Sequence, residues 1–434
     1  MMAAAGSAVG LGNIWRFPYL AGVHGGAAFL LIYLVMILLV GLPLVIAEFT
    51  VGRAGRRGPV RSFRRLAPDK KWYMVGYLAV ITGFAILGFY SVVAGWTMRF
   101  LVEAFANNFA GHTASEIAFS FDWFVNSGWQ PLLYVIGFVV VTAVIVGAGI
   151  EKGIERYNKI LMPLLLVMLL FLCVNSIFMD GFAEGMAFLF KPDFSKVTSQ
   201  TFFDAMGQVF FSLSLGMGVM ITYSSYAPKD DNLPASKGMV TVIDTFIAVI
   251  AGIAIFPAVF TYGISPTQGP ELVFMTLPNV FAQMQGGYIV SVLFFCLLFI
   301  AALTSAISIF ETLTSFLIEE LKFTRKLAVA ANGALVFILS FICVASQMEG
   351  SAIKVLGMNF FDFLDTLSAN WLLTLGGFAT AIFTGWFFEK RLLRRAFTSD
   401  GRYANAIYPV FFLVVRFIVP VALALIFLSK TGVI

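Results

Sequence analysis

Two short stretches of this chain place helix-breaking glycines and polar side chains inside apolar segments. They are AVGLGN at 8–13 and SLSLGMG at 212–218. A helix that is broken within a membrane leaves carbonyl and N–H groups that hydrocarbon cannot satisfy, so a polar group must fill the gap. Freed carbonyls bind a cation, and the N-terminus of a half-helix faces an anionic group such as a carboxylate. Each stretch is therefore a candidate site for an ion or a zwitterion.

Close helix packing is the alternative role for the glycine pair at 10 and 12, because small residues let helices approach one another. Asn13, Arg16 and Ser212 lie within or next to the two stretches. Polar residues inside membrane segments are costly and mark functional positions. These three residues favour the binding site.

The elements that must position these stretches are membrane-spanning helices. Hydrophobic residues make up 60% of the 434, charged residues make up 12%, and the mean hydropathy is +0.93. This composition is typical of an integral membrane protein. Apolar runs that can cross a hydrocarbon core of about 30 Å number eleven, at 10–23, 27–51, 72–102, 131–149, 159–179, 205–227, 237–264, 287–318, 326–345, 362–388 and 405–429.

The loops between these spans differ in charge. Five alternate loops hold 21 of the 28 Lys and Arg residues, and the loop at 53–71 alone holds eight. Lys and Arg concentrate in cytoplasmic loops, so we expect a cytoplasmic N-terminus, an extracytoplasmic C-terminus and a location in the plasma (inner) membrane. The excess of basic over acidic residues therefore reflects membrane topology and does not indicate binding to nucleic acid.

The two interrupted stretches each open a block of five spans. The blocks are 1–180 and 205–388, and one extra span at 405–429 remains. Interrupted helices at corresponding places in two halves are typical of transporters built from inverted repeats, which bind their substrate near the bilayer midplane. We therefore expect one all-α transmembrane transporter domain over 1–434.

Several motifs closely resemble the neurotransmitter:sodium symporter family, and in particular its prokaryotic amino-acid transporters. They are GSAVGLGNIWRFPY (6–19), GLPLVIAEFTVGR (41–53), KGIERYNK (152–159), GQVFFSLSLGMG (207–218) and ALTSAISIFE (302–311). The resemblance covers the whole chain. It implies a LeuT-type 5+5 inverted repeat with first and sixth helices unwound at mid-membrane, alternating access, and sodium-coupled uptake of an amino acid.

The resemblance implies two sodium sites, and sodium prefers hard oxygen ligands. The first would use Ala8, Asn13, Ser212 and a residue of the seventh span. Counting back from Gly252 places Asp244 where the family usually has Asn, whereas counting back from Pro257 places Ile243 there. We prefer Asp244 because Ile has no ligand atom. The second site would use Gly6, Val9, Ala301, Thr304 and Ser305, although helix hydroxyls more often bond to their own helix.

Chloride balances the charge of the first sodium ion in animal relatives. Tyr33, Gln208 and Ser212 match the side chains that hold it. A carboxylate at 244 would supply the negative charge itself, with a Coulomb attraction of several kcal/mol at about 4 Å. We therefore expect transport without chloride. A protonated or paired Asp244 is the alternative.

The substrate site implied by the resemblance suits an amino acid. N–H groups of Leu11 and Gly12 and the Tyr90 hydroxyl would hold the carboxylate, and Gly10 replaces the Asp of amine-transporting relatives, so the substrate must bring its own carboxylate. Further contacts would come from Ser7, Ala8, Ile86, Phe211, Ser212, Ser214, Met217, Ser305 and Ile309. This mostly apolar pocket favours hydrophobic or aromatic amino acids.

Gates are implied on each side of the substrate. Tyr90 and Phe211 would form an aromatic lid, and Arg16 would pair above it with Asp365; Asp362, one helical turn earlier, is the competing partner. Tyr226 and Glu319 resemble residues of the network that closes the inner side in the family.

The first half-helix has only some eight residues, about 12 Å long, and lacks a basic residue and a Trp found in relatives. We expect a misassigned start codon or a leaky inner gate, with Glu319 lacking its partner.

Two other functions share these features. One is a proton-coupled amino-acid transporter of the same fold, in which Asp244 would carry the proton. The other is an amino-acid sensor that does not transport. The sequence holds no nucleophile–base pair, metal-ligand cluster or phosphate-binding loop, and Glu48 and Glu311 are expected to pair within the bundle. We therefore do not expect an enzyme.

Overall fold

The computed structural model describes residues 10–149, 156–227, 231–263, 265–266, 272–284, 286–403 and 405–430. Helices dominate these residues, and a two-residue antiparallel hairpin joins α16 to α17. The elements of the first half are η1 (Gly12–Arg16), α2 (Phe17–Val23), α3 (Ala27–Met36), η2 (Ile37–Gly41), α4 (Leu42–Gly55), α5 (Pro59–Leu66), α6 (Tyr73–Phe105), α7 (Ala114–Asn126), α8 (Trp129–Gly147), α9 (Arg156–Ser176), α10 (Phe182–Phe190) and η4 (Phe194–Lys196).

The second half continues the helical pattern. Its elements are α11 (Ser199–Ser212), α12 (Val219–Tyr226), α13 (Leu233–Thr261), η6 (Leu272–Thr276), α14 (Leu277–Gln283), α15 (Gly287–Leu321), α16 (Arg325–Gln347), β1 (Lys354–Val355), β2 (Met358–Asn359), α17 (Phe360–Thr366), η7 (Leu367–Leu372), α18 (Leu373–Ile382), η8 (Phe383–Phe387), α19 (Lys390–Thr398), α20 (Tyr408–Leu413), η9 (Val414–Ile418) and α21 (Val419–Lys430).

Nine helices among the described residues are long and apolar enough to cross a membrane. Each coincides with one of the expected spans, with ends that differ by a few residues. The other two expected spans, at 10–23 and 205–227, are shorter helical pieces. The span at 205–227 is divided for a local reason, because it contains the glycine-rich stretch SLSLGMG at 212–218.

The sixth span is interrupted as expected. Helix α11 ends at Ser212 and α12 begins at Val219. Between them, Ser214, Gly216 and Gly218 have positive φ angles of 53°, 77° and 75°, a region that favours glycine because it has no Cβ. In the first span, unwinding was expected over residues 8–13. Leu11 is helical and η1 begins at Gly12, so the structure does not show the expected break over residues 11–13, and residues 8 and 9 lie outside the described residues.

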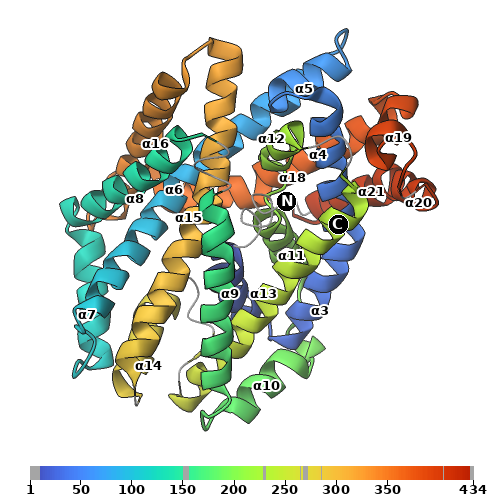
Figure 1. Cartoon of the computed structure of the whole chain (residues 1–434). Helices are drawn as coiled ribbons and strands as arrows, with labels where there is room; N and C mark the ends of the chain where they lie inside the picture. Colours follow the sequence, from blue (N-terminus) through green and yellow to red (C-terminus); the bar gives the residue numbers. More distant parts are fainter. Residues whose placement is uncertain are drawn as a thin grey trace.

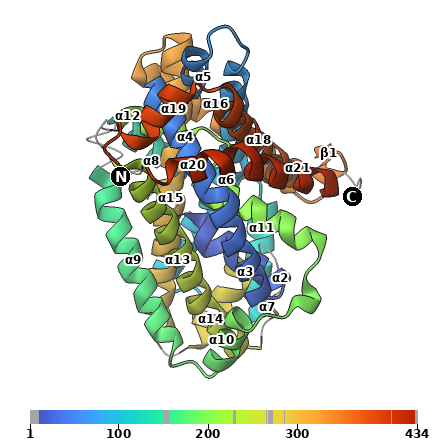
Figure 2. The ribbon, with the colours of Figure 1, turned by 90° about the vertical axis from the view of Figure 1, so that its right-hand side faces the viewer.

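Long helices surround these interrupted spans. Helix α6 packs along α15, and α9 packs along α13. One end of the molecule carries α5 and the start of α16, and the opposite end carries α7, α10 and α14 (Figure 1). In the second view, α19 and α20 lie on the outside of the bundle, beside α4 (Figure 2). The interrupted helices are thus enclosed by continuous ones.

The tight packing at the break generates a prediction. A Cβ atom at Gly216 would contact the Leu373 carbonyl oxygen, and its φ is strained for other residues. We expect Gly216→Ala to destabilise the protein by about 1–3 kcal/mol, measured as a lower midpoint of thermal unfolding in detergent.

Gly238→Ala is the matched control, because a Cβ there meets no atom within 4 Å. Within helix α13 this change should leave the midpoint unchanged or raise it. Equal midpoints for the two variants would contradict the role of Gly216.

Candidate functional site

A small cavity of about 10 Å³ lies where the first and sixth spans meet α6 and α15. It would have to widen to admit a ligand, since ligand pockets measure about 300 Å³ or more. Nine of the ten described residues expected to contact the substrate line it, and Gly10 joins them. The lining residues are Gly10, Gly12, Ile86, Tyr90, Phe211, Ser212, Ser214, Met217, Ser305 and Ile309.

The Tyr90 hydroxyl lies at the edge of this cavity, where a carboxylate was expected. It donates to the Ala302 carbonyl at 3.2 Å and is close enough to the Leu11 backbone and the Ser305 side chain to interact with them. Leu11 is fully buried. The hydroxyl and the Leu11 N–H, which were expected to share the carboxylate, are therefore neighbours.

Gly10 and Gly12 bring the first span close to its neighbours. A Cβ at Gly10 would contact the Ser305 hydroxyl, and a Cβ at Gly12 would lie 3.1 Å from the Phe211 ring. The two glycines thus permit close packing as well as access to the cavity. Close helix packing and a binding site, the two roles considered for these glycines from the sequence, are therefore compatible.

Next to the cavity, Asn13, Ser212 and Asp244 form one hydrogen-bonded cluster. The Asn13 amide donates to Asp244 Oδ1 at 2.7 Å and to Ser212 Oγ at 3.2 Å, and Ser212 Oγ donates to Asp244 Oδ1 at 2.7 Å. All three are buried. The structure therefore brings Asp244, and not a residue one position earlier, to the expected first sodium site.

Several buried oxygens at this cluster have no hydrogen-bond partner among the described residues. They are Asp244 Oδ2, Gln208 Oε1 and the Tyr33 hydroxyl. The Tyr33 hydroxyl faces Ser212 and Asp244, and the Gln208 amide donates to the Gly12 carbonyl at 2.7 Å. Buried oxygens without a donor are costly, and a cation is a ligand that would satisfy them.

The expected second sodium site is described in part. Thr304 Oγ1 donates to the Ala301 carbonyl at 3.1 Å, so this hydroxyl does bond to its own helix. Its lone pairs can still accept a cation, since a hydroxyl has two acceptor sites. Ser305 lies beside Gly10, which places this part of α15 against the first span. Gly6, Ser7, Ala8 and Val9, expected at the two ion sites or the substrate site, lie outside the described residues.

At one side of the cavity, Arg16 contacts both Phe211, expected to form part of a lid, and Asp365 of the tenth span. Its Nη1 lies 3.3 Å from Asp365 Oδ1, and its guanidinium lies 4.9 Å from the centre of the Phe211 ring. The rings of Tyr90 and Phe211 are 6.3 Å apart. Asp362 is bonded instead to Asn359. Of the two acids weighed as partners of Arg16, the structure pairs it with Asp365.

On the opposite side, the two expected inner-gate residues have separate partners. The Tyr226 hydroxyl donates to Glu311 at 3.3 Å, and Arg325 donates to the same carboxylate at 2.5 Å. Glu319 accepts the Gly58 N–H at 3.0 Å. Glu319 thus has a backbone partner in the turn before α5. Its expected partner in the first half-helix concerns a part of the chain outside the described residues.

Glu48 supports the break in the sixth span. One of its carboxylate oxygens accepts the Gly216 N–H at 2.7 Å, and the residue is buried. Glu48 was expected to pair within the bundle, but its backbone partner could not be read from the sequence. A charged residue in an otherwise apolar run was the available signal.

His24 and Asp204 form a contact that sequence reasoning missed. His24 Nε2 lies 2.8 Å from Asp204 Oδ2, and its Nδ1 lies 3.2 Å from Thr201 Oγ1. The pair joins the loop after α2 to α11, the outer parts of the two interrupted spans. A lone His between glycines gave no indication of this partner, which is distant in sequence.

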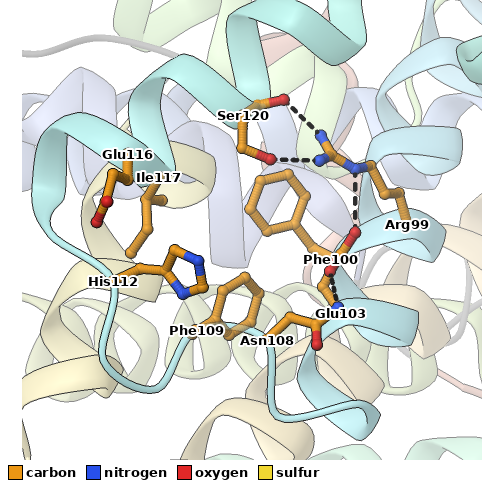
Figure 3. A pocket seen from close by; sticks show the side chains of 9 residues that line it. All are labelled: Arg99, Phe100, Glu103, Asn108, Phe109, His112, Glu116, Ile117 and Ser120. Atoms are coloured by element: carbon orange, nitrogen blue, oxygen red, sulfur yellow. Dashed lines mark hydrogen bonds and ion pairs between the residues drawn. The ribbon is translucent and has the colours of Figure 1, made fainter.

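A separate cavity of about 190 Å³ opens between α6 and α7 (Figure 3). Arg99 there donates to Ser120 at 2.6 Å and pairs with Glu103 at 3.6 Å, while Glu103 accepts from Asn108. The Thr113 backbone and hydroxyl donate to Glu116 and lower the pKa of its carboxyl. These polar groups are thus bonded to one another.

Comparison with known families identifies the class of protein that this fold and site define. The chain matches the model of the Sodium:neurotransmitter symporter family over residues 1–120 and 117–433. The protein therefore belongs to this family. Its multi-pass membrane character follows from the family together with the nine apolar helices of the described residues.

Individual relatives agree with this assignment. The uncharacterized sodium-dependent transporter YhdH of Bacillus subtilis (strain 168) is 35% identical over 433 residues, which cover 100% of this chain and 96% of YhdH. The sodium-dependent neutral amino acid transporter B(0)AT2 of Bos taurus is 28% identical over 287 residues, covering 59% of this chain and 39% of B(0)AT2.

A solved structure is also similar over nearly the whole chain. The crystal structure of MhsT in complex with L-phenylalanine is 42% identical, has a TM-score of 0.93, and is matched over 98% of this chain and 97% of MhsT. The expected LeuT-type fold is confirmed. The chain is a sodium-dependent transporter that takes a small-molecule substrate, and it is not an enzyme.

The ion pair above the cavity generates a prediction. Asp365→Asn removes the charge that Arg16 meets at 3.3 Å, which should weaken closure over the substrate. We expect labelled substrate to dissociate about tenfold faster, equivalent to ~1.4 kcal/mol, in a filter-binding assay. Asp362→Asn is the control and should leave the rate within about twofold, because Asp362 bonds to Asn359. A larger effect from Asp362→Asn would refute the pairing.

Proposed function

We propose that this protein imports an amino acid together with two sodium ions by alternating access. The observation that carries the proposal is the Asn13–Ser212–Asp244 cluster, buried directly beside the central cavity. Ser212 belongs to the cluster and also lines the cavity. A cation held there would lie next to a substrate carboxylate, so that each would stabilise the other.

The second ion would bind at Ala301, Thr304 and Ser305 with carbonyls of the first span. The location of α15 beside Gly10 supports this proposal. An ion at this place would hold the first span against α15. Sodium binding and the position of the first span would then be coupled.

The substrate class follows from the cavity lining. Gly10 supplies no carboxylate, so an amine without its own carboxylate would lack a counter-charge. Ile86, Met217 and Ile309 provide an apolar wall, and Phe211 adds an aromatic ring. The phenylalanine bound to MhsT and the neutral amino acids named for B(0)AT2 support the same class. We therefore propose hydrophobic or aromatic amino acids.

Transport is proposed to be independent of chloride. The carboxylate of Asp244 is in the cluster where a chloride would otherwise balance the sodium charge. Tyr33 and Gln208 remain near it, but a fixed negative charge disfavours a second anion. The carboxylate thus replaces the anion.

The topology is proposed from the charge of the loops. The end that carries α5 and α19 would face the cytoplasm, with the N-terminus inside and the C-terminus outside. Residues 1–180 and 205–388 would form the two inverted repeats, and 405–429 the extra span. Arg16 and Asp365 would then close the outer side, and Tyr226 and Glu319 would contribute to the inner side.

Uptake into proteoliposomes tests the function. An inward sodium gradient should drive accumulation of labelled amino acid, and Trp and Leu should compete at least about tenfold better than Glu and Lys, because the cavity wall is apolar. Accumulation driven by a proton gradient without sodium would favour the proton-coupled alternative. Binding without accumulation would favour a sensor, and stronger competition by Glu and Lys would refute the substrate class.

The proposal that the Asp244 carboxylate takes the place of chloride is tested separately, by replacing chloride and by replacing Asp244. Wild-type uptake should persist when gluconate replaces chloride. Asp244→Asn removes a charge worth several kcal/mol to a neighbouring cation, so the apparent sodium affinity should fall by about tenfold or more. Asp122→Asn, on the exposed side of α7, is the control and should change nothing. Loss of wild-type uptake in gluconate would refute chloride independence.

A further inference from the structure

Arg416 is a charged residue within an apolar span, Tyr408–Leu428. It follows Tyr408 by eight residues, about 12 Å along the helix. Its guanidinium lies 4.2 Å from the Trp386 ring, 5.3 Å from Phe417 and 5.6 Å from Phe412. Its Nε is buried and has no hydrogen-bond partner among the described residues. Three aromatic faces contact this charge, but no carboxylate of the described residues forms an ion pair with it.

Two cations of the neighbouring helix α19 also lie along a row of aromatic rings next to Arg416. Tyr408, Phe412 and Arg416 are spaced four residues apart and share one helix face, and the rings of Tyr408 and Phe412 are stacked 6.0 Å apart. Lys390 Nζ lies 5.9 Å from the Phe412 ring, and the Arg394 guanidinium lies 5.8 Å from Tyr408. Lys390, Arg394 and Arg416 thus line one seam between α19 and α20–η9.

Helix α19 itself has a basic face and an apolar face. Its sequence KRLLRRAFT contains four cations and no acid, and the cations are exposed while Leu393, Ala396 and Phe397 are buried against the bundle. No ion pair joins these cations to a carboxylate among the described residues. A helix with this pattern lies at a membrane interface.

The seam faces outward from the protein. Figure 1 and Figure 2 place α19 and α20 at the periphery, with α19 toward the end of the molecule that carries α5. Trp386, Leu413 and Phe417 beside Arg416 are each about half exposed. Apolar side chains with this exposure contact lipid tails in a membrane protein, and Trp is enriched at the level of the headgroups.

We propose that the seam between α19 and η9 binds the phosphate of an anionic phospholipid. Arg416 reaches from within the hydrocarbon region and donates to the phosphate oxygens, for which a guanidinium is well suited. Lys390 and Arg394 supply further positive charge at the headgroup, and the acyl chains lie along Leu413 and Phe417. A lipid supplies the anion that the protein lacks at this depth.

Lipid titration of the purified full chain, followed by native mass spectrometry, tests this site. Phosphatidylglycerol and phosphatidylcholine with identical acyl chains are the probes. The wild type should bind the first phosphatidylglycerol about tenfold more tightly than phosphatidylcholine, as expected for charge-assisted bonds worth ~1.4 kcal/mol. Arg416→Met should reduce the ratio to about twofold or less, and Arg416→Lys should retain part of it.

Lys71→Gln is the matched control, since Lys71 is exposed at the same end of the molecule but lies outside the seam; it should keep the full ratio. Lys390→Gln with Arg394→Gln changes only exposed residues and should lower the ratio even if Arg416→Met does not fold. Equal binding of the two lipids by the wild type would overturn the proposal, as would an unchanged ratio in the variants that fold. Displacement by soluble glycerol phosphate would assign the site to a free anion and would also overturn it.

Discussion

The interruption of the sixth span is the constraint on which the rest of this structure depends. A backbone that leaves the helical path inside a membrane must find partners for its N–H and C=O groups within the protein. Glu48 accepts the Gly216 N–H, and the Leu215 N–H is accepted by the Phe210 carbonyl. Continuous helices enclose the region, so these bonds are shielded from lipid and water. The break can therefore persist as a fixed feature.

The break determines what lies around the cavity. Ending α11 at Ser212 leaves that hydroxyl next to Asn13 and Asp244 and also places it at the cavity wall. A site with unsatisfied oxygens then adjoins a mostly apolar pocket. In the proposed function, this juxtaposition would let a cation and a substrate carboxylate stabilise each other, since the two charges would be close and water largely excluded.

Contacts at the two ends of the cavity are few and polar. Arg16 links the first span to Asp365 and to the Phe211 ring, and Glu311 joins Tyr226 to Arg325. His24 and Asp204 join the first and sixth spans to each other. Small numbers of ion pairs and hydrogen bonds can exchange between two arrangements at modest cost, as the alternating access proposed for this protein would require.

The sequence by itself determined the spans and indicated the two interruptions, because hydropathy and helix-breaking glycines act locally. Most of the cavity lining and the residues Asn13, Ser212 and Asp244 were expected from the resemblance to a known family, although two ways of counting left the last residue open. Only the tertiary structure decided that Asp244 meets Asn13, that Asp365 and not Asp362 meets Arg16, and that Glu48 meets Gly216. Helical spacing makes residues one turn apart nearly equivalent in sequence, whereas hydrogen bonds depend on distances of a few tenths of an ångström between helices that are far apart along the chain.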